Sequence, residues 1–78
     1  MKARELIGKG PYGPETLKVL YQVFDDAWNS IAADFGDNPL AIGAARLKLA
    51  NAILSLAAEG TRNAKQLKAA ALEIMARE

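Results

Sequence analysis

The most regular hydrophobic pattern in the chain lies between Pro14 and Gly36. Large apolar residues recur there at steps of three and four, which is the spacing of one face of an α-helix. They are Leu17, Tyr21, Phe24, Trp28, Ile31 and Phe35. Pro14 suits the first helical position after a Gly13 N-cap, and Gly36 suits a left-handed residue at the helix end. The pattern predicts a helix over residues 14–35 whose aromatic face is the centre of the core.

A second helix is predicted over residues 39–59. Asn38 is suited to cap it and Pro39 to begin it, so the link from the first helix is short. One narrow stripe of this segment is polar, and it consists of Lys48, Asn51, Ser55 and Glu59. The remaining circumference is almost entirely apolar, which is typical of a central helix or of a helix with a partner on each side.

The third predicted helix spans residues 63–77 and begins at an Asn63 cap. Two short links force neighbouring helices to run antiparallel. The sequence therefore predicts an all-α fold: an up-down-up bundle of three helices over residues 14–78, preceded by a short flexible arm over residues 1–13. The predicted core is Leu17, Leu20, Tyr21, Phe24, Trp28, Ile31, Phe35, Ile42, Leu49, Ile53, Leu56, Leu67, Ala71 and Ile74.

Arg46 interrupts the apolar face of the second helix. An unpaired buried charge is too costly to keep, so its guanidinium must either reach solvent or find a partner. In an antiparallel hairpin, Arg46 lies about as far beyond the turn as Trp28 lies before it. Stacking on Trp28, or a salt bridge to Asp25, would satisfy the charge. We expect an internal polar feature of Arg46, Asp25 and Trp28, with anion binding as the less favoured alternative.

Several apolar residues lie off the main faces of their helices. They are Val19, Val23, Leu40, Leu47, Leu54 and Leu72. Leu40, Leu47 and Leu54 repeat at seven residues, which is the spacing of a helix–helix seam. In a monomeric bundle Leu47 and Leu54 belong to the core, and this is the favoured arrangement. Otherwise the six residues form a surface for self-association or for a protein partner.

The composition disfavours most catalytic chemistry. The chain of 78 residues has a net charge of +1 and contains neither cysteine nor histidine. This removes thiol nucleophiles, soft-metal sites and the usual general base near neutral pH. Asp25 and Asp26 are adjacent and diverge by about 100° on a helix, so they do not form a catalytic pair. We expect no enzyme activity, no catalytic residues, no cofactor and no metal.

The alternative function is nucleic-acid binding by a helix-turn-helix-like arrangement. Gly60 lies in the link, and Arg62, Lys65 and Lys68 give the last helix a basic start. The apolar positions of that motif would, however, be filled by Ser55, Glu59 and Gln66. The near-zero net charge also provides no general attraction to phosphates. Nucleic-acid binding is therefore the second choice, after protein–protein interaction or self-association.

The sequence predicts a cytoplasmic protein. No apolar run near the start is typical of a signal peptide, and no apolar segment approaches the length of a membrane span. The succession GPYGPETL, a long aromatic helix and DNP resembles small bacterial proteins. That resemblance identifies no family, and it implies no activity and no site residues.

Overall fold

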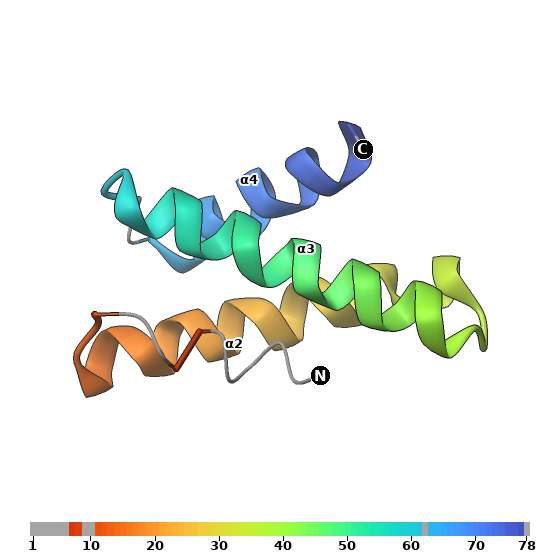
Figure 1. The fold of residues 1–78 in the computed structure, drawn as a ribbon. Helices are drawn as coiled ribbons and strands as arrows, with labels where there is room; N and C mark the ends of the chain where they lie inside the picture. Colours follow the sequence, from red (N-terminus) through yellow and green to blue (C-terminus); the bar gives the residue numbers. More distant parts are fainter. Residues whose placement is uncertain (1–6, 9–10, 62, 78) are drawn as a thin grey trace.

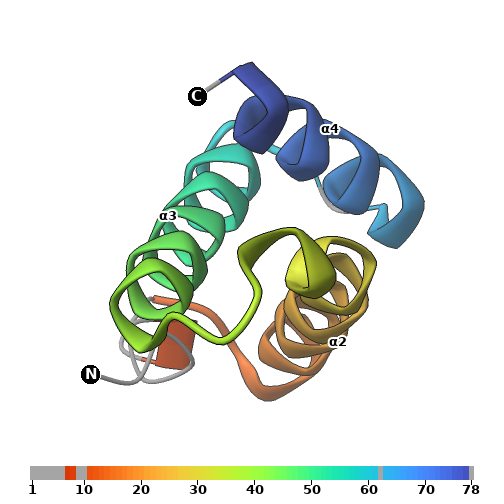
Figure 2. The same cartoon turned by 90° about the vertical axis from the view of Figure 1, so that its right-hand side faces the viewer.

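A computed structural model describes residues 7–8, 11–61 and 63–77 of the chain. Its elements are α2 (Pro14–Ile31), the 3₁₀-helix η1 (Ala32–Phe35), α3 (Pro39–Ala58) and α4 (Ala64–Arg77). α2 and α3 run in opposite directions, and α4 turns back across both of them (Figure 1). Viewed from the end, the three helices surround a common interior, and η1 leads the chain across from α2 to α3 (Figure 2). The predicted all-α three-helix bundle is confirmed.

The first helix begins as predicted but ends earlier. Gly13 is the N-cap, and its carbonyl oxygen accepts a 2.9 Å hydrogen bond from the Leu17 amide. The α-helical part stops at Ile31, and the chain continues as η1 to Phe35 rather than as one helix to that residue. A 3₁₀ turn of this kind satisfies carbonyls that an α-helix end leaves without a donor. Gly36 follows with a φ of 58° and a ψ of −138°, which only glycine adopts readily.

α3 is fixed at both ends by its own residues. The side-chain oxygen of Asn38 accepts hydrogen bonds from the amides of Leu40 and Ala41, as an N-cap does. At the other end Gly60 has a φ of 101°, and the Thr61 amide donates to the Leu56 carbonyl at 3.1 Å. Together with the Gly60 to Ala57 bond, this is a Schellman motif. The chain therefore turns sharply and returns as α4.

The start of α4 is also capped as predicted. The Asn63 side-chain oxygen accepts hydrogen bonds of 2.9 Å from the Lys65 amide and 3.2 Å from the Gln66 amide. Near the other end Glu73 and Arg77 form an ion pair at four-residue spacing. Both side chains are largely exposed, so this pair adds only a few tenths of a kcal/mol. The Asn63 cap, rather than this surface ion pair, determines where α4 begins.

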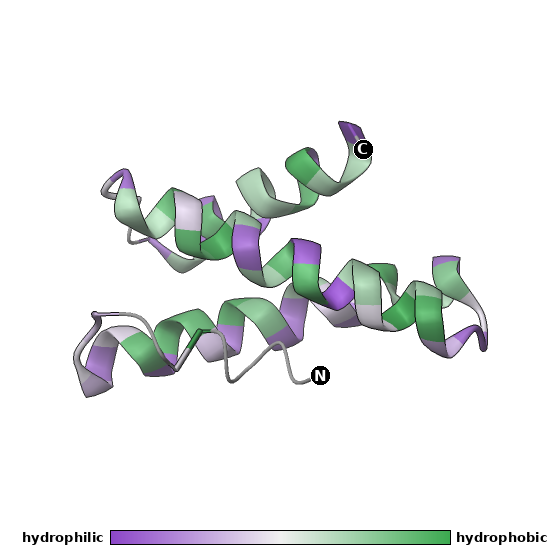
Figure 3. Ribbon diagram, in the orientation of Figure 1, coloured by the Kyte–Doolittle hydropathy of each residue, from purple (hydrophilic) through white to green (hydrophobic). Residues whose placement is uncertain are grey.

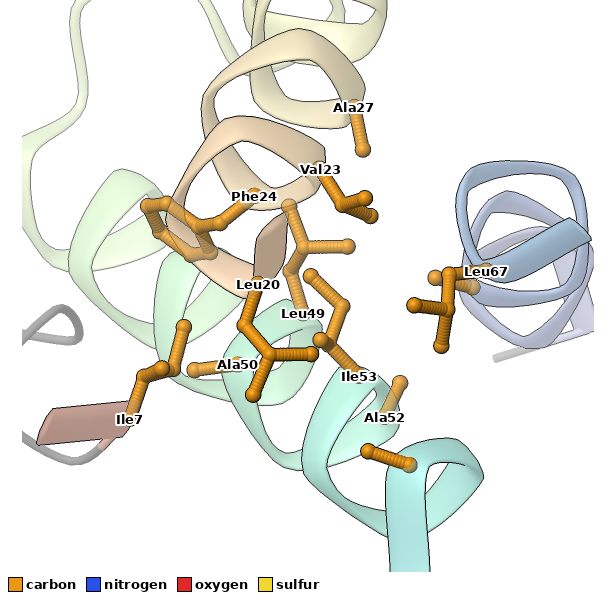
Figure 4. Packing of buried hydrophobic residues seen from close by; sticks show 12 residues of the cluster. Ile7, Leu20, Val23, Phe24, Ala27, Leu49, Ala50, Ala52, Ile53 and Leu67 are labelled. Carbon is orange, nitrogen blue, oxygen red and sulfur yellow. The ribbon is translucent and has the colours of Figure 1, made fainter. Parts of the chain in front are cut away.

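The core is made by all three helices, and its buried side chains in the described residues are entirely apolar. Leu20 and Val23 of α2 point toward Leu49 and Ile53 of α3 and toward Leu67 of α4 (Figure 4). Of the predicted core, the fully buried members are Leu20, Phe24, Leu49, Ile53, Leu67 and Ala71. The half-buried members are Leu17, Tyr21, Trp28, Ile31, Phe35, Ile42, Leu56 and Ile74.

The predicted face of α2 is rotated from the buried one. Val23, expected on a surface, is 2% exposed, and Ala27 is fully buried. The reason is that α2 packs against α4 as well as α3, so its buried face must be wide enough for both. Val23 and Phe24 lie about 100° apart around the helix, and the core includes both. The prediction included Leu20 and Phe24 but missed Val23 and Ala27, because it followed the aromatic residues toward one side of this face.

Ile7 belongs to the same core, although it precedes the predicted domain. It is fully buried, and it points toward Ala50 of α3 (Figure 4). A β-carbon placed on the neighbouring Gly8 would lie 2.6 Å from the Tyr21 hydroxyl, so the chain passes directly over α2 at this point. Residues 7–8 of the expected flexible arm are therefore packed onto the bundle. The rest of the expected flexible arm, apart from residues 11–13, lies outside the described residues.

Candidate functional site

The surface of α3 away from the core is largely apolar in the first half of the helix. Leu40 is 86% exposed and is the one large apolar side chain in the described residues that lies open to solvent. Gly43 and Ala44 are exposed, and Leu47 is half-buried. At 3.6 residues per turn these four residues lie within about 100° of one another. We call Leu40, Gly43, Ala44 and Leu47 the Leu40 face.

The Leu40 face carries no charge. From Pro39 to Leu47 the single charged residue is Arg46, and its guanidinium lies over aromatic rings of α2. The polar residues of the helix come later, at Lys48, Asn51 and Ser55, and all three are exposed as predicted. Coloured by hydropathy, most of α3 is green, and its purple residues lie in the middle part of the helix (Figure 3). Only a third of the helix is nevertheless buried in the bundle.

The structure divides the six residues predicted to form an interaction surface. Leu40 is exposed, and Leu47 is half-buried beside it. Leu54, Val19 and Leu72 are half-buried and pack against the core, which agrees with the monomeric arrangement favoured for Leu54. Val23 is corrected to a core residue. The prediction of one surface from all six residues is therefore replaced by a smaller surface around Leu40.

Arg46 stacks on aromatic rings. The central carbon of its guanidinium lies 5.3 Å from the centre of the Phe24 ring and 5.7 Å from that of Trp28. These are distances at which a cation is attracted by the face of a ring. The stacking of Arg46 on Trp28, one of the two predicted alternatives, is therefore observed. Asp25 makes an interaction of its own.

The aromatic contacts continue to the end of the hairpin. The rings of Trp28 and Phe35 stack with their centres 5.6 Å apart and their planes inclined by 17°. The sequence reasoning did not include Phe24 in the Arg46 contact. The signal was available, because Phe24 lies one turn before Trp28 and a group stacked on one ring is close to the other. The cluster joins α2, η1 and α3, and it orients the half of α3 that carries the Leu40 face.

An apolar hollow lies beside the Leu40 face. It has a volume of about 190 Å³ and is lined by Phe35, Ala41, Ala44, Ala45, Lys48 and Met75. A second hollow of about 150 Å³ shares Phe35 and Met75 and reaches Ile31, Asp34, Leu72 and Ala76. Both are open and contain no convergent set of polar groups, which is what a small-molecule site needs for orientation. Sequence periodicity gave no signal for them, because they depend on how α4 crosses α3.

The remaining predicted chemistry lies in separate places. No three acidic side chains of the described residues gather closely enough to hold a metal ion. Lys65 is exposed and Lys68 half-buried at the start of α4, and Arg62 lies outside the described residues. Nothing in the structure tests nucleic-acid binding, which stays a prediction.

α3 is long and apolar enough to cross a membrane, judged by length and composition alone. The sequence-based statement that no segment approaches such a span is therefore wrong in that sense. The same test is passed by core helices of soluble proteins. Arg46, Lys48 and Asn51 lie near the middle of α3, where charged and polar groups are costly in lipid.

No protein-family model, curated protein or solved structure matches the chain. Function is therefore argued from the surface of this fold.

Proposed function

We propose that this chain is a small helical interaction module, bacterial in type and cytoplasmic, which acts by protein–protein contact through the Leu40 face. The observation that supports the proposal is the 86% exposure of Leu40 on a helix that is apolar nearly all round and only one third buried. Exposed single leucines are common, but an uncharged face centred on one is typical of a contact surface.

The energetics favour occupation of this face. Burying a leucine side chain contributes about 1.5–3 kcal/mol. The chain does not obtain this from its own fold at Leu40, whereas it does at Leu20, Leu49 and Leu67, which are fully buried. The face is also well ordered for binding. Asn38 caps the first turn of α3, and the ring cluster of Phe24, Trp28 and Phe35 fixes the turn before it. A preformed surface loses little conformational entropy when it binds.

The proposal includes no catalytic step. Serine and threonine side chains have no histidine to activate them, because the chain contains none. The apolar hollows next to the face would receive side chains of a partner rather than a substrate.

Site-specific photo-crosslinking in cells tests the proposal. A photoreactive amino acid replaces Leu40 in one variant and Gln22 in a control variant. Gln22 is exposed on α2, about 160° to 200° around that helix from the buried Leu20 and Phe24. We expect defined protein adducts, either with a second copy or with another protein, from position 40 and not from position 22. Equal adduct patterns from the two positions contradict the proposal.

A further inference from the structure

Met75 lies where α3 and α4 separate. The two helices diverge toward the C-terminal end of α4 (Figure 1). On the α3 side of this region the small residues Ala41, Ala44 and Ala45 line the open hollow of about 190 Å³. Met75 of α4 and Phe35 of η1 line the same hollow. The flexible thioether of Met75 is suited to filling irregular space of this kind between diverging helices.

The Met75 side chain is open to small solutes and is also part of the packing. It is half-buried, and it borders the hollow of about 150 Å³ as well as the larger one. Both hollows are open, so a small solute can reach the side chain from either of them. The same side chain packs against the buried apolar cluster of the bundle. A chemical change at Met75 therefore needs no unfolding and still alters the packing.

We propose that Met75 is a reversible oxidation site, modified by a hydroperoxide, and that its oxidation state determines how firmly the end of α4 is attached to the bundle. The thioether sulfur attacks one peroxide oxygen, so that an S–O bond forms as the O–O bond breaks. The proton of the attacked oxygen passes to the departing oxygen, and with hydrogen peroxide the products are methionine sulfoxide and water. The sulfur is oxidised by two electrons and the peroxide is reduced. The chain contains no cysteine, so no thiol of its own competes for the oxidant.

The sulfoxide does not suit the place that the thioether occupies. Oxidation makes the group polar, and a buried sulfoxide oxygen needs a hydrogen-bond donor. Of the side chains that line the two hollows, Phe35 is apolar and the Asp34 carboxylate only accepts hydrogen bonds. Lys48 is exposed and makes an interaction of its own. We therefore expect the oxidised side chain to turn toward water and give up its apolar contacts, which loosens the last turns of α4.

Peroxide treatment of the full chain, followed by peptide mass mapping and thermal melts, tests the proposal. Met75 should gain one oxygen at a rate within about tenfold of that of free methionine, because its side chain is half-exposed. The oxidised parent is expected to melt about 4–8 °C below the untreated parent. The two methionine sulfoxide reductases, one for each sulfoxide epimer, should return the Tm to the parent value.

Two variants separate oxidation of Met75 from other effects of peroxide. Met75→Leu keeps the volume and removes the thioether, so it should fold as the parent does. It retains Met1, and peroxide should change its Tm by less than about 1 °C. Met75→Gln places a permanent polar group at this position and should melt near the oxidised parent without any peroxide. Hydrogen exchange should quicken by a larger factor at residues 72–77 than at residues 20–24, both in this variant and in the oxidised parent.

Each measurement can overturn the inference. Oxidation of Met75 more than about tenfold slower than that of free methionine would show that peroxide does not reach the side chain. An oxidised parent that melts like the untreated one, or a Met75→Leu variant that loses as much Tm as the parent, would show that the attachment of α4 does not depend on this sulfur. Exchange that quickens equally at residues 72–77 and 20–24 would contradict the loosening of the end of α4.

Discussion

α2 and α3 are of similar length, 18 and 20 residues, but they distribute their apolar residues in different ways. α2 buries large side chains such as Leu20 and Phe24 and turns Gln22 and Asp26 to solvent. α3 buries mainly alanine, and its exposed side includes Leu40. α2 therefore has one polar face toward solvent and buries its large apolar side chains within the bundle. α3 uses small residues to let its neighbours approach closely and leaves an apolar face outside. The difference indicates that the apolar residues of α2 stabilise the fold, whereas α3 also presents an apolar face to solvent.

The sharpest test of this comparison contrasts one large side chain from each helix. Phe24→Ala removes a fully buried ring from the centre of α2. It is expected to lower the free energy of unfolding by about 3–5 kcal/mol, through lost burial and the cavity that remains. Leu40→Ala, on α3, should change the free energy of unfolding of the monomer by less than about 0.5 kcal/mol. Urea unfolding followed by circular dichroism at micromolar protein measures both values, and equal losses would contradict the division between the helices.

A second test concerns the alanines that α3 buries. Ala50→Leu places three more carbon atoms where Ile7 approaches, and it should destabilise the fold by about 1–3 kcal/mol through overpacking. Ala58→Leu, at an exposed position of the same helix, is the matched control and should be nearly neutral. Thermal melts of the two variants measure the difference. If Ala50→Leu melted like Ala58→Leu, α3 would not be held closely on this side.

The helices themselves were predictable because their ends are encoded locally. Gly13, Asn38 and Asn63 cap the starts as the sequence predicts, and Gly60 ends α3. These signals need no knowledge of tertiary structure, since each acts within one turn. The break of the first helix at Ile31 was not predictable in the same way. No glycine or proline marks this break. It depends instead on the path that the chain takes from α2 to α3.

The faces were less predictable than the helices. Periodicity identifies an apolar stripe, but it cannot say whether one neighbour or two will cover it. Val23 is buried because α4 packs on that side of α2, which is a fact about the whole fold. α3 shows the converse. A helix that is apolar on most sides gives no single preferred direction, so the sequence favoured Leu47 and Leu54 as core but left open a surface that joins them to Leu40. The packing decides between these alternatives, since Leu54 packs against the core and Leu40 faces solvent.

Arg46 gives a smaller expected effect that bears on how α3 is attached to α2. Arg46→Met keeps a long side chain over Phe24 and Trp28 and removes the charge, so it should lower stability by only about 0.5–1 kcal/mol. Trp28 is the one tryptophan of the chain, so its fluorescence should report the change directly. Urea unfolding monitored by that fluorescence provides both readings. A loss of about 3–5 kcal/mol would instead indicate that the substitution leaves a buried charge without its partner.

The smallest expected effect tests how the segment before α2 is attached to the two helices. A β-carbon on Gly8 would lie 2.6 Å from the Tyr21 hydroxyl oxygen but 3.9 Å from the ring carbon that carries it. Gly8→Ala should therefore destabilise the parent by about 1 kcal/mol, because the segment must shift away from α2. In a Tyr21→Phe background the hydroxyl is absent, and the same substitution should be neutral or slightly stabilising, since alanine suits a helical backbone better than glycine.

Tyr21→Phe has its own effect on stability, because Tyr21 makes an interaction beyond this contact. A double-mutant cycle removes that effect, because it compares the loss of stability caused by Gly8→Ala within each background. Equal losses in the two backgrounds would mean that Gly8 does not lie over Tyr21. The Ile7 contact with Ala50 would then lose its support, because Ile7 is adjacent to Gly8 and the two share one path over the bundle. A coupling of about 1 kcal/mol would show that this segment packs against α2 at Tyr21.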